Sequence, residues 1–292
     1  MRVWVTSFRR AACGSFAAAL LSSASVYALQ PVSVSDPALN PPAGGGGDSV
    51  APVLSLDGNS VMFSSVACNL SLGGGNTPIR APFPPCLNVY VHNRTNHCAQ
   101  LVSGNLAGTG GGNADSYPAA LSADGRFALF ESRASDLTIP DTNGCRDIFL
   151  RDLLAGTTAL VSISTNGGSA NGESRDAVMS ADGRYVAFVS DASNLVFGDT
   201  NRIPDVFVRD TQSNTTVIVS QGAVATNFAT IGGSEGPAIT PDGRYVVFCS
   251  SATNLVPEIR TTGDIYVRDL TDAMFFAQLA APGFAYTRPE SA

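Results

Sequence analysis

Short apolar runs separated by Asp-Gly turns recur four times along the chain. The clearest copy reads Ser180-Ala181-Asp182-Gly183-Arg184-Tyr185-Val186-Ala187-Phe188. Asp-Gly between two apolar runs is a strong hairpin signal, because Gly adopts a positive φ without steric cost. Related segments begin at Ser55, Ser122 and Thr240, and successive Asp-Gly pairs lie 67, 58 and 60 residues apart. This period is too long for a helical repeat and predicts four-stranded propeller blades.

The third copy predicts four strands, over residues 177–180, 185–190, 205–209 and 216–220. The second of these runs is apolar at almost every position, as expected of a middle strand that neighbouring blades cover on both faces. The same division of the other copies predicts blades over roughly residues 50–103, 116–164, 174–220 and 235–280. The sequence thus predicts an all-β propeller of four-stranded antiparallel blades, with four recognisable repeats.

The two ends of the repeat region leave ring closure open. Pro31 to Ser35 aligns with the fourth-strand segment Leu160 to Ser164, so it looks like the last strand of a missing blade. The fourth blade already has an outer-strand candidate in Met274 to Leu279. A small closed ring, an open arc completed by another copy, and a truncated gene product all fit this pattern, although an open arc leaves unpaired strand edges.

The first 28 residues have the pattern of a secretory signal peptide. Three Arg residues precede a short apolar stretch from Ala11 to Val26, and Val26-Tyr27-Ala28 fits a cleavage site. The stretch is too short and too interrupted to span a bilayer, which needs about 20 apolar residues. We therefore expect a soluble bacterial protein of residues 29–292, periplasmic or secreted.

Charge narrows the class of partner. Removal of residues 1–28 takes away three of the 17 basic residues and none of the 24 acidic ones, which leaves a formal charge of −10. A chain this acidic repels phosphate backbones, so nucleic acid is excluded as a partner. Every basic residue is Arg, so lysine Schiff-base and lysine general-base chemistry are excluded as well.

Three consecutive motifs resemble a known family. The order is Ser-x-Asp-Gly-Arg-Tyr-Val-x-Phe, then Ala-Ser-Asn-Leu-Val, then Asp-Thr-Asn-x-x-x-Asp-Val-Phe-Val-Arg-Asp. This pattern resembles the bacterial TolB-type, WD40-like β-propeller repeat, from about Gln30 to Ala280. The resemblance implies an exported propeller that binds other proteins or ligands, and related blades also occur as accessory domains of peptidases. Propellers of this type usually have six blades, whereas four are recognised here.

Two acidic series are candidate sites. The first lies in the loops before the third strands and comprises Asp141, Asn143, Asp147, Asp199, Asn201 and Asp205. Their oxygens fit a hard cation such as Ca²⁺, although Asp and Asn also cap tight turns through their own backbone. The second series, beside the first strands, comprises Asp48, Asp115, Glu173 and Glu235. These carboxylates are expected to ring the mouth of a central channel and bind a cation or a basic peptide, unless they only terminate the strands in solvent.

The histidines and cysteines give further predictions. His92 stands where the other copies have Arg, so we expect a surface position, and neither it nor His97 recurs in the other blades. Cys68 and Cys86 flank one inserted loop and could form a disulfide in an oxidising compartment. Cys249 lies in an apolar middle strand and is expected to be buried and inert.

The leading functional prediction is an exported, non-catalytic propeller that engages a protein or peptide partner on one face. It rests on repeated blades, the absence of catalytic motifs from the sequence, and loops at fixed positions on a rigid scaffold. The alternative is a hydrolase or lyase that uses the channel-mouth carboxylates as acid and base. A homo-oligomer is expected if the ring is open.

Overall fold

The computed structural model describes residues 29–39, 44–71, 85–139, 141–223, 233–252, 255–256 and 263–271. The predicted signal peptide and the outer strand expected at Met274 to Leu279 lie outside the described residues. Contacts divide the chain into residues 1–31 and residues 32–292. The elements below all belong to the second unit. No helix of the described chain combines the length and apolarity needed to cross a membrane.

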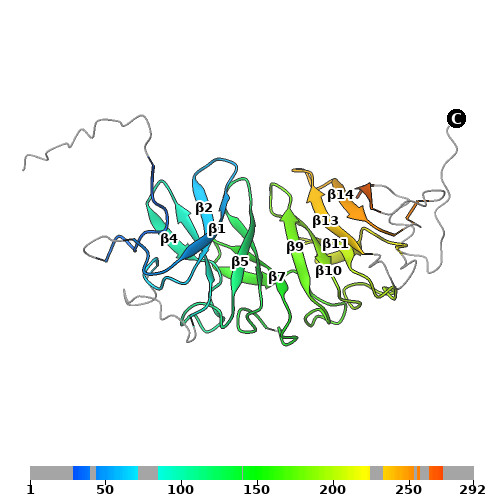
Figure 1. Ribbon diagram of the computed structural model, residues 1–292, viewed down its shortest axis with the longest axis horizontal. Coiled ribbons are helices and arrows are strands. Elements are labelled where there is room, and N and C mark those ends of the chain that lie inside the picture. The colour runs from blue at the N-terminus through cyan, green and yellow to red at the C-terminus, as the bar shows by residue number, and fades with distance from the viewer. Residues whose placement is uncertain are drawn as a thin grey trace, which may run out of the picture. The chain divides into compact units, whose positions relative to one another are not determined.

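Within these residues the strands form four antiparallel sheets, here called blades 1 to 4 in chain order (Figure 1). Blade 1 contains β1 (Ser49–Leu54), β2 (Ser60–Ser65), β3 (Asn88–Asn93) and β4 (Cys98–Leu101). Blade 2 contains β5 (Ser116–Leu121), β6 (Phe127–Ser132), β7 (Asp147–Asp152) and β8 (Thr157–Leu160). Blade 3 contains β9 (Ser174–Met179), β10 (Tyr185–Ser190), β11 (Asp205–Asp210) and β12 (Thr215–Ile218). Blade 4 contains β13 (Ser234–Ile239), β14 (Tyr245–Ser250) and β15 (Asp264–Asp269).

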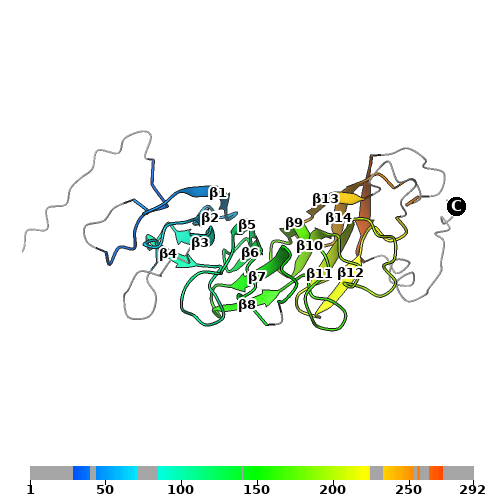
Figure 2. The ribbon, with the colours of Figure 1, turned by 60° about the horizontal axis from the view of Figure 1, so that its bottom comes forward.

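Each sheet is a meander in which neighbours in sequence pair in space, and Figure 2 shows successive blades side by side. The predicted all-β architecture of four-stranded antiparallel blades is therefore confirmed, with three strands of blade 4 among the described residues. The inner strand β9 begins at Ser174, three residues before the predicted start. Asp176 has a φ of 54° and the pairing of β9 with β10 shifts register there. This bulge breaks the alternation of side chains, so the first half of the strand lacks the pattern expected of a strand.

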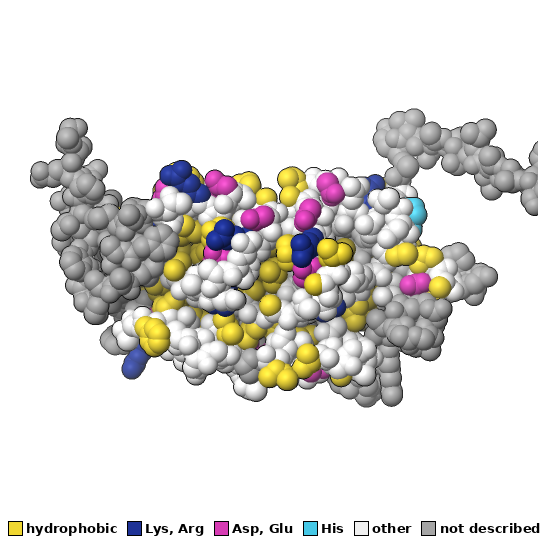
Figure 3. Space-filling view, turned by 180° about the vertical axis from the view of Figure 1, so that it is seen from behind, with side chains coloured by type: hydrophobic (Ala, Val, Ile, Leu, Met, Phe, Trp, Pro, Cys, Tyr) yellow, Lys and Arg dark blue, Asp and Glu magenta, His cyan; other side chains and the backbone are white. Residues whose placement is uncertain are grey.

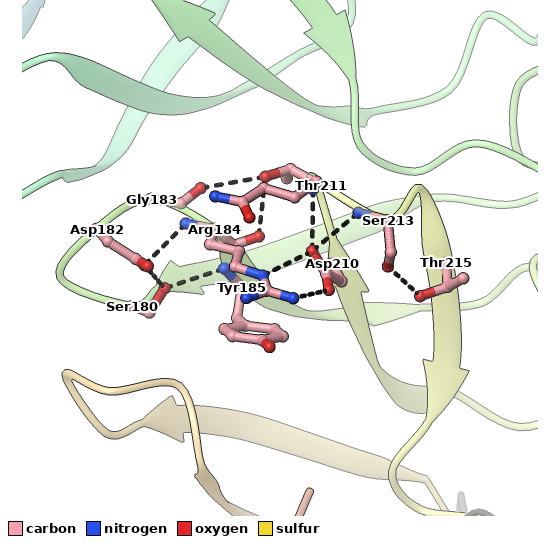
Figure 4. A network of polar contacts seen from close by, with 10 residues as sticks. Ser180, Asp182, Gly183, Arg184, Tyr185, Asp210, Thr211, Ser213 and Thr215 are labelled. Carbon is pink, nitrogen blue, oxygen red and sulfur yellow. Dashed lines mark hydrogen bonds and ion pairs between the residues drawn. The ribbon is translucent and has the colours of Figure 1, made fainter.

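The predicted Asp-Gly hairpins are present in all four blades. Gly58, Gly125, Gly183 and Gly243 have φ values of 70°, 69°, 74° and 74°. In blade 3 the Asp182 carboxylate accepts hydrogen bonds from the Ser180 hydroxyl at 2.6 Å and the Arg184 backbone N–H at 3.0 Å (Figure 4). Arg184 then donates two side-chain hydrogen bonds to Asp210 on β11, at 3.1 and 2.7 Å. The turn is thus tied to the end of the third strand.

This arrangement recurs and joins the blades. Arg126 pairs with Asp152 in blade 2 and Arg244 with Asp269 in blade 4, as Arg184 does with Asp210. Each Arg lies over the aromatic ring that follows it, with its guanidinium carbon 4.7 to 4.8 Å from the ring centroid. The next blade's Gly packs against that ring, Gly183 on Phe127 and Gly243 on Tyr185. In Figure 3 Arg and acidic side chains lie beside each other on one face, with hydrophobic side chains between them.

The hydrophobic core lies between the blades. Each blade has an upstream face toward the preceding blade and a downstream face toward the following one. Upstream faces carry a stacked aromatic pair, such as Phe130 and Phe149 with centroids 5.5 Å apart. In blade 2 this pair packs on the aliphatic downstream face of blade 1, formed by Met62, Val89 and Val91. Equivalent clusters join blade 2 to blade 3 and blade 3 to blade 4.

Val32, before blade 1, takes the place that a residue after an outer strand has between the later blades. Val161 and Val219 follow the outer strands of blades 2 and 3 and pack in the cluster with the next blade. Val32 packs in the same way against the aromatic pair Phe63 and Tyr90 of blade 1. Both aromatic side chains are only 3% exposed. The predicted alignment of Pro31 to Ser35 with Leu160 to Ser164 therefore has a structural counterpart.

Candidate functional site

A groove of about 950 Å³ runs along the outer edge of blade 3. Its floor includes all four residues of β12, which is the edge strand of its sheet. One wall is the loop from Leu195 to Asn201, and residues 163–165 after β8 of blade 2 also line it. We call this site the blade-3 groove. It combines an edge strand with side chains from two blades.

The most exposed apolar side chain at the groove is Phe197, with 91% of its surface accessible. Ile139 occupies the equivalent loop position in blade 2 and is 81% exposed. A large exposed side chain beside a groove can serve as an anchor for a partner, which distinguishes Phe197 from Ile139. Sequence reasoning missed both residues, although each stands two positions before the first Asp of an Asp-Thr-Asn loop.

The groove also contains part of the first predicted acidic series. Asp199 and Asn201 line it, whereas Asp205 lies behind them, fully buried at the start of β11. The Asn201 amide donates to the Asp205 carboxylate at 2.7 Å and to the Ala223 carbonyl at 3.0 Å. Ser220 donates to the other Asp205 oxygen. Burial raises the pKa of Asp205 to about 6, against the lowering effect of these two hydrogen bonds.

Blade 2 repeats this geometry. Asn143 donates to Asp147 at 2.7 Å and to the Ala170 carbonyl at 2.9 Å, and Ser162 donates to the other Asp147 oxygen. Burial raises the pKa of Asp147 to about 6 and also raises that of Asp141. One Asp141 side-chain oxygen is buried without a hydrogen-bond partner. The structure thus brings together Asn143 with Asp147 and Asn201 with Asp205, through amide donors.

Removal of divalent cations by a chelator distinguishes a cation site from turn capping in these loops. The Asn143 and Asn201 amide groups donate to the buried carboxylates, so hydrogen bonds occupy one oxygen of each that a cation would need. We expect the melting temperature of residues 29–292 at pH 7.5 to be the same in EDTA and in millimolar Ca²⁺. A lower melting temperature in EDTA that Ca²⁺ restores would instead assign the predicted cation site. No group of three or more His, Cys, Asp or Glu side chains in the described part of the chain is arranged to hold a metal.

The predicted channel-mouth acids flank the inner strands. Asp48, Asp115 and Glu173 directly precede β1, β5 and β9, and Glu235 is the second residue of β13. Asp115 accepts a hydrogen bond from the Leu87 backbone N–H at 2.8 Å, and Glu173 forms an ion pair with Arg133. Binding of a cation or basic peptide by these four acids stays a prediction, as does the hydrolase or lyase alternative that depends on them.

The structure contradicts two of the three predictions made for single histidine and cysteine side chains. His92 is only 1% exposed, so the predicted surface position is wrong. Two residues after Tyr90 in β3, it lies on the same sheet face as that buried ring. Its ring nitrogens have no hydrogen-bond partner, and burial lowers its pKa. Cys249 is exposed, so its predicted burial is also wrong. The disulfide between Cys68 and Cys86 stays a prediction.

Comparisons with known proteins were made on sequence and on structure. No protein-family model matches the chain, and no curated protein sequence matches it. TolB from Acinetobacter baumannii is similar in structure at 19% identity and a TM-score of 0.41, over 78% of this chain and 41% of that one. A TolB described as putative, from Agrobacterium tumefaciens, has 16% identity and a TM-score of 0.41, over 78% and 79%. The β-propeller domain of the Trilobed protease from Pyrococcus furiosus has 12% identity and a TM-score of 0.38, over 77% and 69%.

The chain thus spans less than half the length of the first of these proteins and most of the second. The strand order of the described residues by itself establishes the antiparallel blades, three of four strands and one of three.

Proposed function

We propose that this chain is an exported, non-catalytic β-propeller protein that binds an extended segment of a protein partner in the blade-3 groove. The single observation that carries the proposal is the groove itself, of about 950 Å³, which lies along the edge strand β12. Edge strands present backbone N–H and C=O groups to which an extended peptide can add as a further strand. Export, to the periplasm or the medium, rests on the signal-peptide pattern of residues 1–28.

The side chains of the groove indicate the chemistry of the partner. Phe197 offers a large apolar contact at the rim. Arg209 also lines the groove. Its guanidinium group already donates hydrogen bonds to the Asn214 carbonyl and the Thr216 hydroxyl, so part of it is engaged within the chain. The carboxylate of Asp199 lies at the same site in a chain of net charge −7. We therefore expect a peptide with an apolar anchor residue and without net negative charge.

Peptide selection tests the proposal. A library of random peptides displayed on phage is selected on residues 29–292, and the best peptide is synthesised and titrated. Replacement F197D is expected to weaken its binding at least tenfold, because the apolar anchor contact is lost and a charge is introduced. The matched control is I139D, at the equivalent position in blade 2, which is expected to leave binding unchanged. Equal losses in both variants, or no loss in either, would place the partner elsewhere.

A further inference from the structure

The edge strand β12 borders a second hollow besides the blade-3 groove. This hollow has a volume of about 370 Å³ and lies between blade 3 and the Asp-Gly turn of blade 4. We call it the turn pocket. Thr215 and Val217 line both hollows, whereas Thr216 and Ile218 line the groove alone. The groove and the turn pocket therefore meet at one edge strand.

The two hollows lie on opposite faces of blade 3. Val217 pairs with Val208, whose side chain is buried against blade 4 on the downstream face. Ile218 pairs with Phe207, and both pack in the cluster with blade 2 on the upstream face. Successive side chains of β12 thus belong to different faces. A strand added to this edge continues the pleat, so its side chains alternate in the same way.

Apolar side chains form the inner part of the turn pocket. Val208 and Leu270 line it and are only 2% and 8% exposed. The ring of Tyr185 lines it as well, with the guanidinium group of Arg184 lying over that ring (Figure 4). Apolar walls of this kind accommodate the aliphatic stem of a long side chain whose charged end stays at the rim.

The charges at the rim of the turn pocket leave one acid over. Its two Arg side chains already form ion pairs, Arg184 with Asp210 and Arg244 with Asp269. Asp242 is exposed and lines the same pocket. None of the ion pairs among the described residues includes Asp242. The pocket therefore favours a basic group over a neutral or an acidic one.

We propose that the segment bound in the blade-3 groove is an extended strand with side chains on both faces of blade 3, an apolar one at Phe197 and a Lys or Arg in the turn pocket beside Asp242. This inference rests on the proposed function and specifies its ligand. Because successive residues of a strand point to opposite faces, the basic residue stands an odd number of positions from the apolar anchor. A basic residue also suits a chain of formal charge −7.

Replacement D242N tests the basic position. An Asn side chain can accept the same hydrogen bonds from the Thr240 hydroxyl and the Arg244 backbone N–H, so the turn is expected to stay intact. The peptide selected on residues 29–292 is synthesised in two forms, with its basic residue and with Gln in its place. The wild type is expected to bind the basic form about two- to fivefold more tightly, as exposed ion pairs allow. D242N is expected to bind both forms equally.

The matched control is D182N. Asp182 accepts the equivalent hydrogen bonds in the turn of blade 3 but lines neither hollow. This variant is expected to keep the wild-type preference for the basic form. The preference should also shrink between about 50 and 500 mM NaCl, because salt screens an exposed pair. Loss of the preference in D182N as well as in D242N would mean that overall charge causes it, and would overturn the inference.

The remaining outcomes separate this inference from the proposed function. A selected peptide that is weakened by F197D but has no basic residue at an odd separation from its anchor overturns the inference and leaves the groove in place. So does a preference for the basic form that persists in D242N. A selection that yields no peptide, or one insensitive to F197D, overturns the proposed function and this inference with it.

Discussion

Replacement of Gly243 by Ala is expected to lower the free energy of unfolding by about 2 to 5 kcal/mol. Gly243 has a φ of 74°, which costs an L-residue about 1 to 2 kcal/mol. The new methyl group would also overlap the ring of Tyr185, whose Cγ atom lies 2.9 Å from the Cβ position. Arg184 lies over the same ring, so the ring cannot move away without losing that contact. Urea unfolding followed by circular dichroism measures the loss.

The matched control for this variant is G58A. Gly58 occupies the same Asp-Gly turn in blade 1 and has a φ of 70°, but the nearest atom to its Cβ position is Arg94 Nη1 at 4.0 Å. The control carries the backbone strain alone and should lose about 1 to 2 kcal/mol. Similar losses in the two variants would mean that the Gly243 contact with Tyr185 contributes nothing to the joint between blades.

Stability is expected to fall as the pH rises from about 4 to 6. The folded-state pKa of Asp147 and of Asp205 is raised to about 6 by burial, above the unfolded value of about 3.9. The folded chain therefore binds these two protons more tightly than the unfolded chain does. The stabilisation is complete below pH 4 and is lost as the pH rises through 6, at a cost of about 3 kcal/mol for each group.

A second set of carboxylates acts in the opposite direction at lower pH. Hydrogen bonds from Arg126 lower the pKa of Asp152 to about 2, and Arg184 and Arg244 lower those of Asp210 and Asp269. Stability from these pairs is present above about pH 4 and lost below it. Together the two sets predict maximum stability between about pH 4 and 5.

Urea unfolding at pH 4.5 and pH 7.5 tests this profile. The wild type should be more stable at pH 4.5 by a few kcal/mol, and the variant D147N/D205N should lose most of the difference. Blade 1 shows that a neutral side chain fits this position, because Asn88 begins β3 there and accepts a hydrogen bond from Ser103 at 2.9 Å. Greater wild-type stability at pH 7.5 than at pH 4.5 would contradict the raised pKa of these two buried Asp side chains.

Short sequence motifs were sufficient to predict the hairpins of the fold. The strands at Tyr185 and Asp205 were predicted at their first residues, because the Asp-Gly turn and the apolar run that follows act within a few positions. The start of β9 was missed because a bulge at Asp176 interrupts its alternation. His92 and Cys249 were wrongly assigned because their burial depends on neighbouring strands and blades, which a single strand pattern does not contain.

The candidate site was predictable only in part. Asp199 and Asn201 were singled out by their oxygen side chains, and both line the blade-3 groove. The groove itself depends on the distance between two blades and on the open edge of β12, which no local motif encodes. Phe197 was overlooked because one apolar residue in a polar loop is common at protein surfaces. Its counterpart Ile139 in blade 2 is the signal that could have identified it.

Amide hydrogen exchange of residues 29–292, with and without the selected peptide, tests peptide binding at blade 3 most directly. If the peptide adds a strand to blade 3, the outward-facing amides of Thr215 to Ile218 exchange more slowly in the complex, and those of the equivalent edge strand β8 do not change. Protection confined to the inner strands β1, β5, β9 and β13, with β12 unchanged, would contradict the groove and favour the mouth of the channel.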